Sequence, residues 1–236
     1  MTLTLPLPAH VYVDEHWAAH LARAREFLRQ PSISAQNVGL RETADCLREW
    51  LVERGAAVSY HGEEVCPIVY AEWNVGAPRT LLVYGMYDVQ PVDGQDWTTP
   101  PFAAQVWEHP VGGESIVARG ACNSKGPLMA FLHALEALRA TSGLPVNIKW
   151  TIEGEEEIGS PNFHQVVQRP DIMAALKRAE GIFIPASWQD INGSVDVNLG
   201  SKGIVELELV ASGERWGRGP QRDIHSSLKA MVDSPA

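Results

Sequence analysis

Residues 80–91 read TLLVYGMYDVQP, and this stretch decides the fold class. Thr80–Tyr84 is a continuous apolar run, as expected for a strand that is buried on both faces of a parallel sheet. The polar residues that follow lie at the carboxyl end of that strand. Ligands of open α/β sheets bind beyond the carboxyl ends of the strands, so the residues after Tyr84 are a candidate site.

Strands and helices alternate on both sides of this stretch. Apolar residues spaced by three and four predict helices, and short apolar runs predict strands. The predicted helices span residues 14–29, 40–54 and 126–140, with another after the start signal Ser160-Pro161, and the strands span residues 57–60, 68–73, 80–84, 146–152 and 181–185. The first helix is expected to bury a stripe formed by Trp17, Leu21, Ala24 and Leu28. The alternation predicts an α/β sheet with helices on both faces.

The pattern changes after Asn192. Residues 195–199 and 204–210 alternate between apolar and polar side chains, which predicts antiparallel strands. We therefore predict a first domain over residues 1–195 and the start of a second over 196–236. A complete second sheet needs more strands than remain, so the second domain is expected to be truncated.

Composition excludes several classes of partner. The net charge of −10 argues against nucleic acid, which requires clustered Lys and Arg. No apolar run approaches the ~20 residues that span a bilayer. The three cysteines are few, odd in number and widely spaced, which favours a reducing compartment, and the N-terminus lacks the features of a signal peptide. A cytoplasmic protein without membrane contact is the expectation.

Three segments that follow predicted strands are candidates for chemistry. They are residues 84–91, 118–126 (ARGACNSKG) and 153–160 (EGEEEIGS). The third holds four carboxylates within five residues, and like charges gathered at a strand end usually require a cation. A solvated acidic loop is the alternative. The position directly after a buried strand favours a site.

These motifs, in this order, resemble the M20 family of zinc-dependent peptidases and amidohydrolases. The resemblance rests on YGxYDVQPVD, then Trp97, Pro101 and Phe102, then RGAxxxKG, then EGEEEIGS, with Arg222–Ser226 similar to the DxHS segment of that family's lid domain. It implies a phosphorylase/hydrolase-like zinc-peptidase sheet with helices on both faces. Residues 1–195 would be the N-terminal part of the catalytic domain, and 196–236 the start of an α+β lid and dimerisation domain.

The resemblance also implies a mechanism with two zinc ions. A water between the metals attacks an amide of a small peptide or N-acyl amino acid, and a carboxylate acts as the base. Glu156 matches that base and Glu157 a zinc ligand. Asp88 matches the aspartate that orients a histidine ligand. His225 matches a lid histidine that contacts substrate, often across a homodimer interface.

Three metal-ligand positions of the family are substituted here. Met86 stands at the position of the first histidine, and a thioether is a poor zinc ligand. Asn123 stands at the position of the bridging aspartate and carries no charge. Ala186 matches a further aspartate, with Asp190 as the alternative register. Only Glu157 is retained, whereas zinc sites need three or four protein ligands.

Several readings stay open. Met86 and Cys122 are soft donors that could form a copper-type site, although a small buried role for Cys122 is favoured. Lys125 could bind a substrate carboxylate or be structural, and Arg119 is expected to pair with a carboxylate. The chain is predicted to be an M20-type metallohydrolase with impaired activity. The alternatives are an inactive homologue that serves as a binding or partner subunit, and a gene fragment.

Overall fold

The computed structural model describes residues 7–186 and, beyond them, positions 190, 192, 194–200, 203, 205, 207, 215, 217 and 219. The chain divides into two units, Met1–Asp196 and Val197–Ala236. The fold below is that of the first unit.

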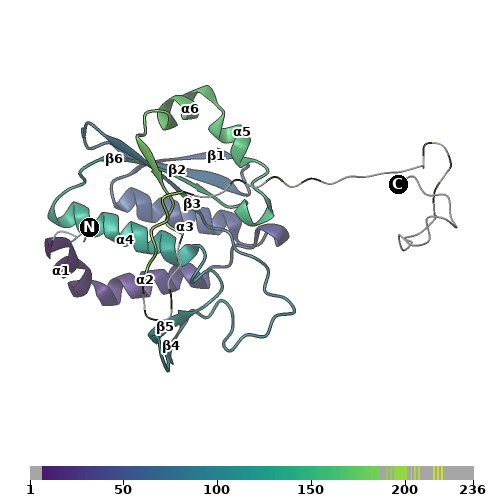
Figure 1. Ribbon diagram of the computed structural model, residues 1–236, viewed down its shortest axis with the longest axis horizontal. Helices are drawn as coiled ribbons and strands as arrows, with labels where there is room; N and C mark the ends of the chain where they lie inside the picture. The colour runs from purple at the N-terminus through teal and green to yellow at the C-terminus, as the bar shows by residue number, and fades with distance from the viewer. Residues whose placement is uncertain are drawn as a thin grey trace. The chain divides into compact units, whose positions relative to one another are not determined.

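A five-stranded sheet forms the centre of this unit (Figure 1). Its strands are β1 (Ala57–Gly62), β2 (Pro67–Trp73), β3 (Thr80–Met86), β6 (Asn147–Glu153) and β7 (Gly181–Phe183), in the order β1-β2-β6-β3-β7. β3 pairs in parallel with β6 and β7, whereas β1–β2 and β2–β6 are antiparallel. The predicted α/β sheet is confirmed, but it is mixed. The connection from β1 to β2 is too short for a parallel crossover, so these two strands form a hairpin.

Helices lie on both faces of the sheet (Figure 1). One side carries α1 (Leu7–Glu15), α2 (Trp17–Arg29), α3 (Leu40–Glu53) and α4 (Lys125–Thr141), and the other carries α5 (Phe163–Val167) and α6 (Pro170–Leu176). Two 3₁₀ turns, η1 (Ser34–Gln36) and η2 (Glu156–Ile158), complete the helical segments. The single helix predicted after Ser160-Pro161 is therefore two short ones, α5 and α6.

The predicted core face of α3 is confirmed. Leu40, Ala44, Leu47 and Leu51 are all buried and belong to one hydrophobic cluster with residues of the sheet and α4. Regular spacing of apolar residues thus identified both the helix and the face that packs on the sheet.

The first predicted helix differs from the structure in two ways. It is divided at His16 into α1 and α2, and α1 begins as early as Leu7. Trp17, expected in the buried stripe, is 56% exposed, because the residues that α2 buries are His20, Phe27 and Leu28, of which only Leu28 belongs to that stripe. The sequence of α1 does not separate an apolar from a polar face, so packing against α4 decides that it is helical.

A hairpin formed by β4 (Gln105–His109) and β5 (Gly113–Val117) was not predicted. The available signal was the Gly112-Gly113 pair between two short apolar runs.

The predicted strand over residues 195–199 does not form. Residues 196–200 are irregular, and Val197 and Leu199 are largely exposed. Alternation of apolar residues produces a strand only where a neighbouring strand and a core face are present. The strand predicted over 204–210 lies mostly outside the described residues, as does His225.

Among the helices of the described residues, none combines the length and the hydrophobicity that crossing a membrane requires.

Candidate active site at the carboxyl ends of the strands

The three predicted segments meet at one edge of the sheet. Met86 pairs with Glu153 in the parallel β3–β6 ladder, so the residues that follow the two strands leave the sheet together. Ser124 Oγ donates a hydrogen bond of 3.0 Å to the Met86 carbonyl, which ties the loop before α4 to the end of β3. The segments predicted as candidates for chemistry therefore lie close together in the structure.

Asp88 fixes the acidic loop. It is fully buried, and its carboxylate accepts hydrogen bonds from the backbone N–H groups of Glu156, at 3.2 Å, and Glu157, at 3.0 Å. Burial raises the pKa of Asp88, and these N–H groups oppose the rise. The resemblance predicts that Asp88 orients a histidine ligand, but the residue two positions earlier is Met86, whose side chain offers no N–H. In this chain the observed partner of Asp88 is the start of η2.

Glu157 and Glu156 lie side by side in that turn and are both half-buried. Gln90 Nε2 donates to Glu157 Oε2 at 2.7 Å and to the Glu157 carbonyl at 3.2 Å. Burial raises the pKa of Glu156, and the charges of Glu157 and Asp88 add to the rise. The carboxylate that the family would offer to a metal is therefore engaged by a neutral amide.

Glu153 is a site residue that the sequence did not single out within the acidic run. It ends β6 and is 1% exposed, and its Oε1 accepts hydrogen bonds from Tyr84 Oη at 2.5 Å and Ser160 Oγ at 2.9 Å. Its Oε2 is buried with no hydrogen-bond partner in the described part of the chain. Burial raises the pKa of Glu153 to about 7. Its position as the last residue of a buried strand was the signal available in the sequence.

The substituted ligand positions do not assemble a metal centre in the described residues. Met86 is a buried residue at the end of β3, Asn123 is exposed just before α4, and Ala186 is exposed three residues beyond β7. Within the ranges that the structure describes, no three His, Cys, Asp or Glu side chains are grouped so that they could hold a metal ion. These residues therefore do not fit a pair of zinc ions.

The two alternative donors do not change this result. Asp190 is exposed and accepts hydrogen bonds of 2.9 Å from the backbone N–H groups of Asn192 and Ser194, which lower its pKa within a local turn. Cys122 is exposed, not buried as expected, whereas Met86 is buried. The buried structural role favoured for Cys122 is thus wrong.

Two cations near the site are structural. Lys125 is buried, and its Nζ donates to the carbonyls of Phe27, at 3.2 Å, and Gln30, at 2.5 Å, at the end of α2. Arg119 donates to the Pro91 carbonyl at 3.1 Å and lies over the Trp97 ring, 5.0 Å from its centroid. The expected pairing of Arg119 with a carboxylate is not observed among the described residues.

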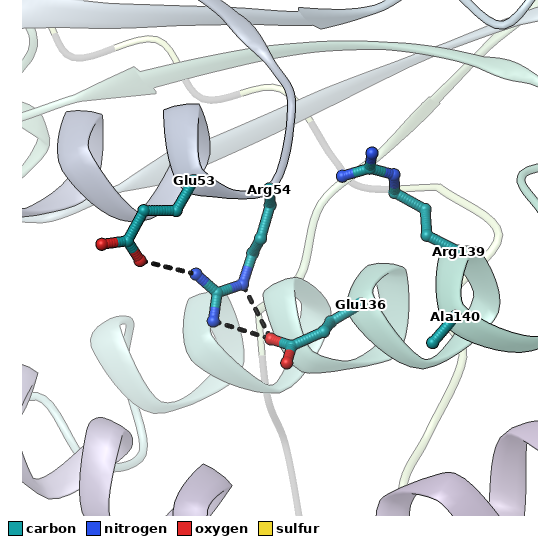
Figure 2. A pocket seen from close by; sticks show the side chains of 5 residues that line it. All are labelled: Glu53, Arg54, Glu136, Arg139 and Ala140. Carbon is teal, nitrogen blue, oxygen red and sulfur yellow. Dashed lines mark hydrogen bonds and ion pairs between the residues drawn. The ribbon is translucent and has the colours of Figure 1, made fainter.

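A pocket of about 420 Å³ lies elsewhere, between the end of α3 and the last turns of α4 (Figure 2). It is lined by Glu53, Arg54, Glu136, Arg139 and Ala140. None of the strand-end residues contributes to it. The candidate site therefore lies at the carboxyl ends of β3 and β6, where the sheet topology and the hydrogen bonds place it, and not at this pocket.

Sequence comparison identifies relatives across most of the chain. Residues 82–215 match the sequence model of peptidase family M20/M25/M40. A Cys-Gly metallodipeptidase of Schizosaccharomyces pombe is 28% identical over 233 residues, which are 92% of this chain and 46% of that protein. A Beta-Ala-His dipeptidase of Homo sapiens is 40% identical over 106 residues, which are 44% of this chain and 20% of that protein. The chain thus spans about half or less of the length of these curated relatives.

Solved structures with the same fold agree. An M20 family metallo-carboxypeptidase of Sulfolobus solfataricus superposes with a TM-score of 0.64 at 38% identity, over 74% of this chain and 38% of that one. Human carnosine dipeptidase 1 superposes with a TM-score of 0.66 at 29% identity, over 75% of this chain and 40% of that one. The motifs, the sheet and the family match over residues 82–215 all indicate the same family, and this chain belongs to the peptidase family M20/M25/M40.

Proposed function

We propose that this chain is part of an M20-type hydrolase acting on a dipeptide or an N-acyl amino acid, and that its hydrolysis is impaired by the substituted metal-ligand positions. Family membership supports the reaction class. The names of the Cys-Gly and Beta-Ala-His dipeptidases favour a small peptide as the ligand. The activity of the whole protein is a proposal because the chain matches 46% of the length of the first of these relatives.

The observation that carries the proposal is the set of donors at the strand ends. The Met86 thioether is soft and neutral, and the Asn123 amide cannot bridge two divalent ions as a carboxylate does. Ala186 supplies no donor. The retained carboxylate, Glu157, accepts a hydrogen bond from Gln90. Zinc in catalytic sites takes three protein ligands for each ion, and the described residues at this edge do not supply them.

Without bound metal ions, Glu156 can act only as a general base. Glu156 is held at the sheet edge by the contact of its own N–H with Asp88. Its carboxylate can accept a proton from a group bound beside it. General acid–base catalysis contributes about 10²- to 10⁴-fold, which is a small part of what amide hydrolysis requires. A chain that keeps Glu156 but not the ligands is therefore expected to turn over slowly.

A second candidate is an inactive homologue that binds a peptide or serves as a partner subunit. It is favoured because the acidic loop keeps an ordered network through Asp88, Gln90 and Tyr84 while the donors for metal are lost. We further propose that residues 196–236 begin a lid domain in which His225 contacts the ligand, that the whole protein is a cytoplasmic homodimer, and that its ancestral cofactor is a zinc pair.

Metal content and dipeptide hydrolysis of the purified chain test the proposal. The chain is equilibrated with zinc, freed of unbound metal and analysed for zinc, then assayed with Cys-Gly and β-Ala-His. We expect less than one zinc per chain and little hydrolysis. The variant Met86→His/Asn123→Asp/Ala186→Asp is expected to retain more zinc. Met173→His in α6, the same type of substitution away from the strand ends, serves as the control and should resemble the parent chain.

About two zinc ions per parent chain together with rapid dipeptide hydrolysis would reject the impairment. Equal zinc in the triple variant and in Met173→His would show that these positions do not form a metal site. Binding of an unhydrolysed dipeptide by the parent chain would favour the partner or binding role.

A further inference from the structure

The helical layer buries a pair of histidines that do not belong to the acidic loop. His20 of α2 is 4% exposed and His133 of α4 is 8% exposed. Their rings stack with centroids 4.2 Å apart and planes inclined by 13°. Both ring nitrogens of His20 and Nε2 of His133 are buried without a hydrogen-bond partner in the described part of the chain. Buried polar atoms are nearly always hydrogen-bonded, so this pair requires an explanation.

The pair is part of a row of rings that links three helices. The Tyr12 ring of α1 stacks on His16, at 3.9 Å between centroids, and the His16 ring lies 6.1 Å from that of His20. A continuous row of aromatic rings therefore runs from α1 through α2 to His133 on α4. This row is the place where the two N-terminal helices rest on α4.

The carboxylate beside the pair is already bound to other cations, so a protonated histidine would find no unpaired anion there. The titratable and charged groups that act on the two imidazoles are Glu136, Arg23, Arg54, His16 and Tyr12, with the imidazoles acting on each other. Glu136 is already paired with Arg54 at 2.7 Å (Figure 2) and with Arg23 at 3.7 Å. A proton on either imidazole would place a third positive charge beside a carboxylate that two guanidinium groups have neutralised.

We propose that the His20–His133 pair makes the packing of α1 and α2 against α4 sensitive to acid, so that protonation of either ring loosens these helices. The neutral rings stack and fill the site, and burying a neutral imidazole costs less than burying a charged one. A charged imidazolium has to be hydrated or paired, and the buried position allows neither. The helices must then move apart or open locally to let water reach the ring.

The pKa shifts of the two histidines have the direction that acid sensitivity requires. Burial lowers the pKa of His133 to about 4, and it lowers the pKa of His20 as well. An imidazole in the unfolded chain titrates at about 6.5. The packed state therefore binds fewer protons than the opened state between about pH 6.5 and pH 4. The packing is fully stable above this window and weakens as the pH falls through it.

Hydrogen exchange of the 236-residue chain at several pH values tests the proposal. Peptides from residues 7–29 and 125–141 report on the three helices, and peptides from β1 and β2 serve as the reference. After correction for intrinsic exchange rates, we expect opening of the helices to become more frequent below pH 6.5, down to about pH 5, by up to about tenfold per unit of pH for each imidazole that takes up a proton. The variant His20→Phe/His133→Phe keeps two stacked rings that do not titrate, and it should lose this dependence. His10→Phe, at an exposed position of α1, should keep it.

The same acid-induced opening in the double Phe variant and in the parent chain would overturn the proposal. If the double variant does not fold, NMR titration of the eight histidines in the parent chain gives the decision. His20 and His133 must then both titrate below pH 6.5. Titration of both His20 and His133 near pH 6.5 would overturn the proposal equally.

Discussion

Tyr87 explains why a glycine follows Glu153 at the start of the acidic loop. A Cβ built on Gly154 would lie 2.3 Å from Cζ of Tyr87, whose buried hydroxyl donates to the Pro67 carbonyl at 2.8 Å. The loop that carries Glu156 and Glu157 therefore leaves β6 in close contact with the hydroxyl end of the Tyr87 ring. Its path depends on the smallest side chain at position 154.

Gly154→Ala tests this close approach. The added methyl group must displace the Tyr87 ring, so we expect the free energy of unfolding to fall by about 1 to 3 kcal/mol. Gly181→Ala is the matched control, because a Cβ at Gly181 would meet nothing within 4 Å and its effect should stay below about 1 kcal/mol. Urea denaturation of both variants measures the difference. Equal effects at the two positions would contradict the steric account.

Lys125 gives a second prediction at this scale. Its ammonium group binds two carbonyls at the end of α2 and lies over the Phe27 ring, 4.6 Å from the centroid. Lys125→Met keeps the volume but leaves these carbonyls without their donor, which should lower the free energy of unfolding by about 1 to 3 kcal/mol. Lys177→Met, at an exposed position after α6, should have little effect. A role in binding a substrate carboxylate would instead reduce ligand affinity and leave thermal stability unchanged.

Among the elements, α3 shows the agreement between pattern and packing most clearly. Its apolar residues at spacings of three and four face the sheet, and its charged residues are exposed or half-buried. α1 shows the opposite case, since its own sequence gives no strong preference and α4 supplies the contact. Isolated short helices are only marginally stable in water, so such an element depends on its neighbours.

Leu47→Ala and Val52→Ala test the assignment of faces on α3. Leu47 is fully buried, so truncation removes transferred apolar surface and leaves a cavity, at a cost of about 2 to 5 kcal/mol. Val52 is exposed on the same helix, and its truncation should change the free energy of unfolding by about 0.5 kcal/mol or less. Chemical denaturation of both variants provides the measurement. A similar loss for both would mean that α3 does not pack through the face described.

For the whole molecule, the buried histidines and Glu153 act on the pH–stability curve in opposite directions, because burial lowers the pKa of His133 to about 4 and raises that of Glu153 to about 7. The pKa values of His20 and His133 are lowered in the folded state, so these two imidazoles bind more protons in the unfolded chain below pH 6.5. The stability that neutral His133 contributes is complete above pH 6.5 and is lost as the pH falls toward 4, by up to about 3 kcal/mol. Asp45 and Glu136 have lowered pKa values, so their contribution is lost at more acidic pH than that of His133.

Denaturant unfolding between pH 7.5 and pH 3.5 separates these contributions. As the pH falls below 6.5, the parent chain should lose stability from histidine, while protonation of Glu153 offsets part of that loss, and carboxylates with lowered pKa values add their loss at more acidic pH. Removal of both imidazoles in His20→Phe/His133→Phe should abolish the histidine loss and leave the contributions of the carboxylates. A curve for the double variant that parallels the parent curve above pH 4.5 would contradict the assignment.

Much of this fold could be predicted from local patterns. The strand at residues 80–84, the helices at 40–54 and 126–140 and the convergence of the three candidate segments follow from periodicity and from the rule that sites lie at strand ends. The hairpin of β4 and β5 and the early start of α1 could not be predicted with the same patterns. Their apolar periodicity is weak, and contacts between distant segments stabilise them.

The sequence by itself determined the family and the chemical identity of the side chains at the strand ends. Met86, Asn123 and Ala186 are neutral residues in any conformation, so the sequence alone shows that these three side chains are poor metal donors, which is the basis of the proposed impairment. Only the tertiary structure decided what the remaining groups contact. Asp88 reaches amides 68 and 69 residues away, and His20 reaches a ring on another helix. Such partners depend on how the elements pack, because burial removes water as the alternative partner of each polar group.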